Sequence, residues 1–414
     1  MTMTVELDAR AKEILRGNDR GGYTVPTHGL YPYQWNWDSV FSAWGFSTFD
    51  LPRAWVEIET LFASQKADGM VPHIIFHQVD PGYFPGPDVW QGGGEPPTSG
   101  ISQPPVAAIL ARLMWEGDRD AGRAAITALY PKMVAWHRWW MEHRVVDGVA
   151  VVTHPWESGR DNCPDWDHGM AGVDGSNVGE YHRRDTGHVD ADMRPKKIDY
   201  DRYLAIVYAG RSMGWDQARV LAEGPFLMTD PAVHFILLRA MDDLAAIGRD
   251  LGQDVAEVEG WAETLRAAVP DMWNPDLGAY DAYDLKSGQW ANNLGTGAWL
   301  SYLAGVENAA MDARLTKAWD KVRYGIPSAD PEGATFNPKR YWRGPSWAVM
   351  NALIALGFQR MGHEAWDARL RRETADMIRI GGFAEYHDPL DGSPCGGANF
   401  SWTAAIWLTW AGRD

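Results

Sequence analysis

The chain has 414 residues, 45% of them hydrophobic and 22% charged, and this composition fits a globular protein and excludes a disordered or fibrous one. Its formal net charge of −17, with no stripe of Lys or Arg to offset it, argues against nucleic acid and anionic membranes as partners. Two cysteines, no apolar stretch near the roughly 18 residues of a membrane span, and an N-terminus without a signal-peptide pattern together predict a cytoplasmic protein.

Helical periodicity with start and stop signals recurs along the whole chain. Asp50 can cap the helix that follows it, Pro104 opens another helix, and Asp230 before a proline opens a third. Strand signals are few, and the Asp-Gly turn at 147–148 and the segment 281–290 predict short hairpins. The expected helices lie near residues 4–16, 37–49, 51–65, 104–116, 120–143, 199–213, 231–251, 254–268, 294–304, 309–322, 344–361, 363–380 and 400–411.

Long connections rich in Gly, Pro and aromatic residues alternate with short ones. Each long connection runs into a rather apolar helix, and these six helices start near residues 37, 104, 199, 294, 344 and 400. Such alternation is typical of two concentric rings of antiparallel helices, in which inner helices are entered from one face and outer helices return to it. The long connections are 18–36, 66–103, 144–198, 269–293, 323–343 and 381–399.

The predicted fold is therefore all-α, an (α/α)6 toroid that forms a single catalytic domain over residues 1–414. Six inner and six outer helices use twelve of the thirteen, and we expect the extra helix within 231–268. Long loops and short β-hairpins on one face are expected to carry the functional residues, because loops on a rigid scaffold hold most sites.

The loop HPWESGRDNCPDWD carries acidic residues suited to glycoside hydrolysis. Inversion at a sugar carbon needs one protonated carboxyl and one carboxylate about 6.5–9.5 Å apart. Nearby tryptophans would raise the pKa of an acid by excluding water from it. Spacing alone does not choose among the four candidates, and we expect three of them to accept backbone N–H groups in turns. The candidates are Glu157, Asp161, Asp165 and Asp167.

The loop GGFAEYHDPLDGSPCGGANFSW offers the second carboxylate. Asp388 precedes Pro and Asp391 precedes Gly, and both dipeptides are typical of turns. Glu385 follows a Gly pair and has no such local explanation. The sequence therefore favours Glu385 as the functional acid of this loop.

Aromatic residues indicate a sugar ligand, since the chain holds 23 Trp and a flat indole face stacks well on a sugar ring. In LYPYQWNWDSVF, four of them come just before Asp38, at a junction between loop and helix rather than at core spacing. We interpret this cluster as a sugar platform, although Asp38 can also serve as the N-terminal cap of the helix. The four aromatic residues are Tyr31, Tyr33, Trp35 and Trp37.

Metal and nucleotide chemistry find little support. His73 and His77 are four residues apart, but no Glu follows the first His and Pro72 argues against a helix there. The glycine-rich stretches lack the strand-to-helix setting of a phosphate loop. We expect no metal, no cofactor and a small glycoside as the only ligand.

Four motifs on four loops together resemble the catalytic domain of glycoside hydrolase family 63 and, more distantly, the trehalases of family 37. They are WNWDS at 35–39, WESGRD at 156–161, YWRGPSW at 341–347 and GGFAEY at 381–386. The resemblance implies an (α/α)6 barrel and an inverting mechanism with Asp161 as general acid and Glu385 as general base. It also implies a sugar subsite. We add Tyr31 and Tyr83 to this subsite because they are aromatic and lie on the loops. The residues of the subsite are Trp35, Asp38, Gln103, Tyr341, Trp342 and Trp402.

Within family 63 the chain is similar to the short bacterial hydrolases of glucosylglycerate and mannosylglycerate. TSGISQPP at 98–105 and MRPKKIDYDRY at 193–203 carry this likeness, which assigns Arg194 and Tyr200 to the carboxylate of glycerate. A guanidinium can hold a carboxylate through two parallel bonds. The alternative is that Arg194 pairs with an acid of its own segment, namely Asp190, Asp192 or Asp199.

The expected activity is thus the inverting hydrolysis of a small α-glycoside, releasing glucose or mannose and most simply from a glycosylglycerate. A neutral oligosaccharide α-glucosidase or a trehalase-like hydrolase is the second hypothesis, although Arg160 stands where trehalases carry an aromatic residue. A sugar-binding protein without activity is the third, and the two carboxylates argue against it. The sequence sets no oligomeric state.

Overall fold

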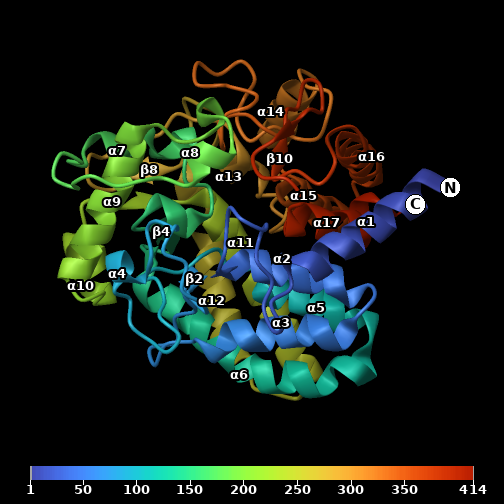
Figure 1. Cartoon of the computed structure of the whole chain (residues 1–414). Coiled ribbons are helices and arrows are strands. Elements are labelled where there is room, and N and C mark those ends of the chain that lie inside the picture. The colour runs from blue at the N-terminus through green and yellow to red at the C-terminus, as the bar shows by residue number, and fades with distance from the viewer. Residues whose placement is uncertain (1, 414) are drawn as a thin grey trace.

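The computed structural model describes residues 2–413, and helices dominate them (Figure 1). Twelve of the thirteen expected helices form within a few residues of the expected bounds, whereas 294–304 contains a single helical turn followed by further turns. The longer helices are α1 (Thr2–Asn18), α2 (Asn36–Ser47), α3 (Leu51–Ala63), α5 (Ala107–Gly117), α6 (Arg119–His143), α9 (Lys197–Ser212), α11 (Pro231–Asp250), α12 (Ala256–Ala267), α14 (Ala309–Trp319), α15 (Ala348–Met361) and α16 (Glu364–Gly381). The last helix, α17 (Ser401–Ile406), is short itself but continues into a π-helical turn over Trp407–Ala411. The short ones are α4 (Pro87–Trp90), α7 (Asp167–Ala171), α8 (Asp185–His188), α10 (Gln217–Glu223) and α13 (Thr296–Trp299).

Strands are short and antiparallel. Both expected hairpins form, and the positive φ angles of Asp147 and Gly148 fit the tight turn that an Asp-Gly pair favours. The first hairpin is β3 (Val145–Val146) with β4 (Val149–Val152), and the second is β8 (Tyr283–Asp284) with β9 (Gln289–Trp290). β5 (Met228–Thr229) lies between β4 and β8 and joins the hairpins into one five-stranded sheet. The remaining pairs are β1 (Gln34–Trp35) with β2 (Ile74–Ile75), β6 (Trp273–Asn274) with β7 (Ala279–Tyr280), and β10 (Tyr386–His387) with β11 (Pro394–Cys395).

The helices pack in two layers. In the inner layer α17 contacts α2, α2 contacts α5, α5 contacts α11, α11 contacts α13, and α15 contacts α17. Each inner helix also packs on one helix that is its neighbour in sequence or lies at the other end of the chain. These pairs are α2 with α3, α5 with α6, α11 with α12, α13 with α14, α15 with α16, and α17 with α1.

The position of α9 corrects one expectation. We expected the helix near residue 199 in the inner layer and the extra helix within 231–268, but α11 takes the inner position and α12 packs outside it. α9 packs on α4 at the edge of the molecule (Figure 1). Nearly every residue of α11 is buried, whereas α9 buries only one side. A helix that is apolar all round belongs in a core, and this criterion outweighs the length of the preceding loop.

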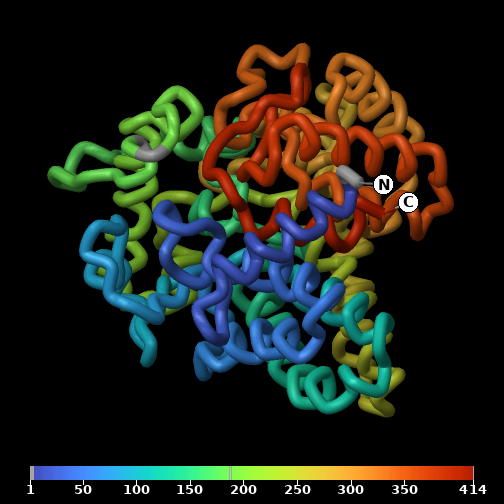
Figure 2. The backbone as a smooth tube through the Cα atoms, turned by 45° about the vertical axis from the view of Figure 1, so that its right-hand side comes forward, coloured from blue at the N-terminus to red at the C-terminus, as the bar shows by residue number. Residues whose placement is uncertain are grey.

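The main hydrophobic core extends from Ala11 to Ala411, and a second, smaller cluster is formed around Trp35 and Trp90. Because α1 packs on α17, the two ends of the chain lie side by side (Figure 2). Among residues 2–413, no helix is long and apolar enough to cross a lipid bilayer.

Candidate active site

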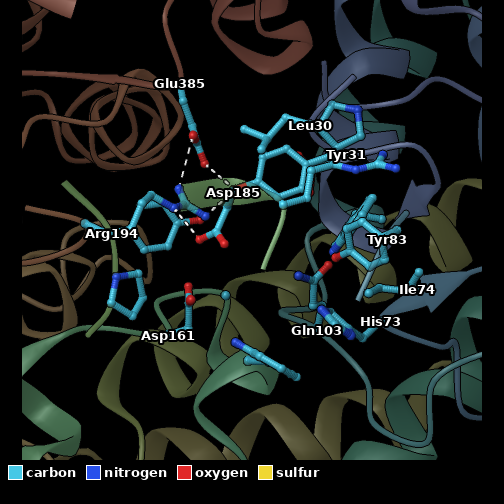
Figure 3. A pocket seen from close by; sticks show the side chains of 18 of the residues that line it. Leu30, Tyr31, His73, Ile74, Tyr83, Gln103, Asp161, Asp185, Arg194 and Glu385 are labelled. Carbon is cyan, nitrogen blue, oxygen red and sulfur yellow. Dashed lines mark hydrogen bonds and ion pairs between the residues drawn. The ribbon is translucent and has the colours of Figure 1, made fainter. Parts of the chain in front are cut away.

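A pocket of about 890 Å³, including its open mouth, lies where the long loops meet. Five of the six long connections supply its walls, and 269–293 does not. Eleven of the twelve predicted site residues line the pocket, and several are seen together in Figure 3. These eleven are Tyr31, Trp35, Asp38, Tyr83, Gln103, Asp161, Arg194, Tyr200, Tyr341, Glu385 and Trp402.

Trp342 is the exception, because it does not line the pocket. Its ring is fully buried and stacks on Trp347, with ring centroids 3.8 Å apart and planes 6° from parallel. Tyr341, its neighbour in sequence, faces the pocket instead. Trp342 therefore packs behind the pocket wall, beside Trp37, and does not face the pocket.

Asp161 is the one carboxylate of the first loop that faces the pocket. The other three candidates are engaged elsewhere in ion pairs, rather than chiefly with backbone N–H groups as expected. Glu157 also accepts the backbone N–H of Thr153 at 3.0 Å, so the turn interpretation holds for it in part. The pairs are Glu157 with Arg144, Asp165 with Arg160, and Asp167 with Arg343.

The surroundings of Asp161 suit a general acid. Burial raises its pKa to about 7, the nearby charges of Glu385 and Asp185 act in the same direction, and Arg194 opposes them. The hydroxyl of Tyr203 donates to the main-chain carbonyl of Asp161 at 2.5 Å and fixes the loop. At neutral pH this carboxyl therefore holds a proton for a substantial part of the time, unlike an exposed aspartate.

Gly159, two residues before Asp161, lets this loop approach the aromatic wall of the pocket. Gly159 has φ +69°, and a Cβ atom there would lie 2.6 Å from the ring of Trp37. The glycine of the WESGRD motif is thus required by both backbone conformation and space.

Glu385 is held on the other side of the pocket by donors alone (Figure 3). Tyr31 donates its hydroxyl to Oε1 at 3.1 Å, the backbone N–H of Gly397 donates to Oε2 at 2.9 Å, and Arg194 donates to Oε2 at 3.4 Å. Gly396 has φ +71°, and a Cβ atom there would lie 2.4 Å from Oε2. A carboxylate fixed by three donors is suited to accept a proton from water.

The short hairpin of β10 and β11 places Glu385, which immediately precedes β10. Asp388 accepts the backbone N–H of Leu390, and Asp391 accepts that of Ser393. Both aspartates act as turn residues, as the sequence indicated.

Asp38 lies in the first turn of α2 and not at its cap. The N-cap position is Trp35, and no side chain caps this end. Asp38 lines the pocket, where burial raises its pKa well above the usual range and the charge of Glu385 adds to the effect. Gln103 fixes the same turn by accepting the backbone N–H of Trp37 at 3.2 Å. The structure therefore favours the binding interpretation of Asp38 over the capping one.

Arg194 is buried among three oxygen partners. It donates to Asp185 at 3.1 Å, to the hydroxyl of Tyr31 at 2.7 Å and to Glu385, and its guanidinium lies 4.2 Å from the ring centre of Tyr341. Its ion pairs are with Asp185 and Glu385 and not with the acids named as alternatives, of which Asp190 accepts the N–H of Asp192 and Asp199 that of Lys196. Arg194 is therefore held by side chains that line the pocket.

Sequence reasoning missed several residues of the pocket wall, among them Asp185, Trp156 and His73. Asp185 follows two arginines in an irregular loop, and no spacing distinguishes it from the other acids there. Trp156 opens the WESGRD motif and could have been found from it. His73 faces the ring of Trp156 at 6.4 Å with planes 16° from parallel, and burial lowers its pKa well below the usual range. Within residues 2–413 no three His, Cys, Asp or Glu side chains are grouped to hold a metal ion.

A buried acid with a raised pKa and a carboxylate held by donors, facing one aromatic pocket, define an acid–base glycosidase site. The model of the family described as mannosylglycerate hydrolase MGH1-like glycoside hydrolase domain matches residues 31–403. The chain belongs to this family of glycoside hydrolases.

Individual relatives agree with this membership over nearly their whole length. The mannosylglycerate hydrolase of Thermus thermophilus is 42% identical over 412 residues, which cover 97% of this chain and 99% of the relative. The glucosylglycerate hydrolase of Mycolicibacterium hassiacum is 35% identical and covers 98% of each chain. The crystal structure of the family 63 mannosylglycerate hydrolase from Thermus thermophilus in complex with Tris and D-glycerate has a TM-score of 0.94 at 42% identity and covers 97% of this chain and 99% of that one.

A more distant likeness concerns the fold alone. The neutral trehalase of Saccharomyces cerevisiae is 16% identical with a TM-score of 0.62, covering 93% of this chain and 72% of that one.

Proposed function

We propose that the protein is an inverting hydrolase of glucosylglycerate or mannosylglycerate, with Asp161 as general acid and Glu385 as general base. The observation that carries the proposal is the placement of both carboxyl groups on one pocket, together with the burial that raises the pKa of Asp161 to about 7. The relatives are hydrolases of mannosylglycerate and of glucosylglycerate, which agrees with the proposal.

In the proposed reaction Asp161 gives its proton to the glycosidic oxygen as the bond to the anomeric carbon breaks. Glu385 takes a proton from a water molecule that attacks the anomeric carbon from the opposite face. The products are a sugar of β configuration and glycerate, while Asp161 ends ionised and Glu385 protonated. The two groups then exchange protons with solvent before the next turnover.

The pocket also offers a place for an anionic leaving group. A net charge of −17 disfavours an anionic ligand unless a local cation faces it. Two arginines line the pocket, Arg184 beside Asp80 and the buried Arg194 next to Glu385, and we take Arg194 as that cation. Tyr200, whose hydroxyl donates to the carbonyl of Phe84 at 3.2 Å, lines the same pocket. We assign the glycerate carboxylate to Arg194 and Tyr200, and the sugar ring to the tryptophan and tyrosine side of the pocket.

We further propose that the fold is an (α/α)6 toroid in one domain, in the cytoplasm. The two helical layers and the main hydrophobic core, which extends over nearly the whole chain, support the toroid and the single domain. Both cysteines are free and buried, in agreement with a reducing compartment.

The proposal is tested by a substrate panel followed by proton NMR of the product. Glucosylglycerate or mannosylglycerate should be cleaved in preference to trehalose and kojibiose, and the β-anomer should appear first. Preference for a neutral disaccharide would overturn the substrate assignment. Initial release of the α-anomer would overturn inversion. Trehalose is disfavoured because Arg160, at the position of the trehalase aromatic residue, is buried between Asp165 and Asp230 at 2.7 Å from each.

The pH dependence of kcat/KM follows from the pKa of Asp161. Below about pH 7 the carboxyl holds the proton that the leaving oxygen needs, and above that pH it is ionised, so kcat/KM should fall as pH rises through about 7. Initial rates from about pH 5 to 9 measure this, since kcat/KM reports groups of the free enzyme. A rate that stays level to the alkaline end of this range would contradict the role given to Asp161.

A further inference from the structure

Asp185 forms an ion pair with Arg194, the buried arginine of the pocket. Its Oδ2 atom accepts the Nε–H of Arg194 at 3.1 Å, and its side chain is only 14% exposed. Burial tends to raise its pKa, but hydrogen bonds and charges from Arg183 and Arg194 outweigh burial and lower the pKa to about 2. A permanently ionised carboxylate of the protein thus sits against the guanidinium that the proposed substrate needs.

The edges of the Arg194 guanidinium are divided among different partners. Nη1 faces Glu385, Nη2 faces the hydroxyl of Tyr31, and Nε faces Asp185 (Figure 3). A substrate carboxylate that forms two parallel bonds needs two neighbouring N–H groups of one edge. The edge formed by Nε and a neighbouring Nη can therefore bind such a carboxylate only after Asp185 gives up its place.

Asp185 is the partner whose release disturbs the site least. Glu385 and Tyr31 form the base and its donor, and moving either would disrupt the reaction centre. Asp185 has a second partner, since Arg183 donates to Oδ1 at 3.0 Å and to Oδ2 at 2.6 Å. After leaving Arg194 it would still be held by two bonds, so no buried charge is left without a partner.

The remaining contacts of Arg183 keep it in position for this role. It donates to the carbonyl of Pro195, the residue after Arg194, at 2.7 Å, and its guanidinium lies 4.3 Å from the ring centre of Tyr200. The segment that carries Asp185 is thereby anchored beside the proposed carboxylate subsite whether or not Asp185 contacts Arg194.

We propose that Asp185 is an internal competitor for Arg194: it occupies the Nε edge in the free enzyme, yields that edge to the carboxylate of the substrate, and takes it back as the carboxylate product leaves. The proposal rests on the proposed function, because it assumes an anionic leaving group. Competition of this kind reduces the apparent affinity for both anionic substrate and anionic product, since part of the binding energy goes into displacing Asp185. It thereby favours release of glycerate.

The test is the variant Asp185→Asn, which keeps the size of the side chain and removes its charge. Inhibition by D-glycerate should become stronger by roughly 3- to 10-fold, and KM for the glycosylglycerate should fall in parallel. Inhibition by free glucose or mannose, which has no carboxylate, should change by less than about twofold and serves as the internal comparison. Weaker or unchanged inhibition by D-glycerate would overturn the proposal.

Asp190→Asn is the matched control, because Asp190 lies in the same loop and only caps the N–H of Asp192. Asp190→Asn should leave inhibition by D-glycerate unchanged. If D-glycerate inhibited this variant as strongly as it inhibits Asp185→Asn, the loss of any negative charge in the loop, and not the release of Arg194 by Asp185, would explain the tighter binding. Thermal unfolding of each variant checks that the loop is intact. If Asp185→Asn is unstable, Asp185→Ser should show the same tightening of D-glycerate, measured by calorimetry.

The outcomes for the proposed function and for Asp185 are separable. A wild-type enzyme that cleaves no glycosylglycerate refutes the proposed function. A wild-type enzyme that cleaves one, but whose Asp185→Asn variant binds D-glycerate no more tightly, refutes the competitor role alone.

Discussion

Replacing Asp161 by Asn is expected to lower kcat by about 10²- to 10⁴-fold on a glycosylglycerate, the usual contribution of a general acid. The amide has the size of the carboxyl but carries no acidic proton for the glycosidic oxygen. On an aryl glycoside with an activated leaving group the loss should be much smaller, because such a group departs without protonation. Steady-state rates on both substrates measure the difference.

Asp167→Asn is the control for this change. Asp167 lies on the same loop but is half exposed and pairs with Arg343 outside the main pocket. It should retain activity on both substrates and unfold close to the wild-type temperature, since exposed pairs contribute little stability. An Asp161→Asn enzyme with near wild-type turnover of the glycosylglycerate would remove Asp161 from the role of acid.

Glu385→Gln should cause an equally large loss, about 10²- to 10⁴-fold in kcat, but on both kinds of substrate. Water must be activated whichever group leaves, and a glutamine side chain cannot take its proton. The hydrogen bond from the backbone N–H of Gly397 can be kept by the amide oxygen, so the hairpin should stay in place. A comparison of the two leaving groups therefore separates a base from an acid.

Asp391→Asn provides the matched control on the second loop, since Asp391 only accepts the N–H of Ser393 at the surface turn. It should leave kcat within a factor of about 2, as surface changes away from a site usually do. If Glu385→Gln retained activity on the aryl glycoside, while Asp391→Asn behaved as expected, the base would have to be sought elsewhere on the pocket.

The two carboxyl groups can do opposite work because their surroundings differ. Asp161 is buried beside two negative charges, and its pKa rises to about 7. Glu385 receives hydrogen bonds from a hydroxyl, a backbone amide and a guanidinium. Like side chains in unlike environments of one pocket thus suit the two different roles that we propose for them.

Helices were the best predicted part of the fold, because periodicity and caps act over a few residues. Asp50 accepts the N–H of Arg53 and Asp230 accepts those of Ala232 and Val233, as their places before helices indicated. The layer to which a helix belongs was less accessible, because it depends on which other helices bury it. The exchange of α9 for α11 in the inner layer shows this limit.

From the sequence alone we could name the two loops that hold the proposed acid and base, and the turn roles of Asp388 and Asp391, which the structure confirms. Those turn roles left Glu385 as the acid of its loop without a local explanation. The sequence could not choose Asp161 from its loop without the resemblance to a family. In the structure the other three acids of the loop pair with arginines, and Asp161 is the one that faces the pocket. The pairs are Glu157 with Arg144, Asp165 with Arg160, and Asp167 with Arg343, and their partners are 13, 5 and 176 residues apart in the chain.

Only the tertiary structure revealed Asp185 beside Arg194, and only it turned Trp342 away from the pocket. Turn chemistry and helix caps are local and can be read from neighbouring residues. The contacts of a pocket join loops that lie far apart in the chain, as Tyr31 and Glu385 do across 354 residues. Which side chain faces the ligand is settled by those distant contacts, and no pattern within a single loop contains them.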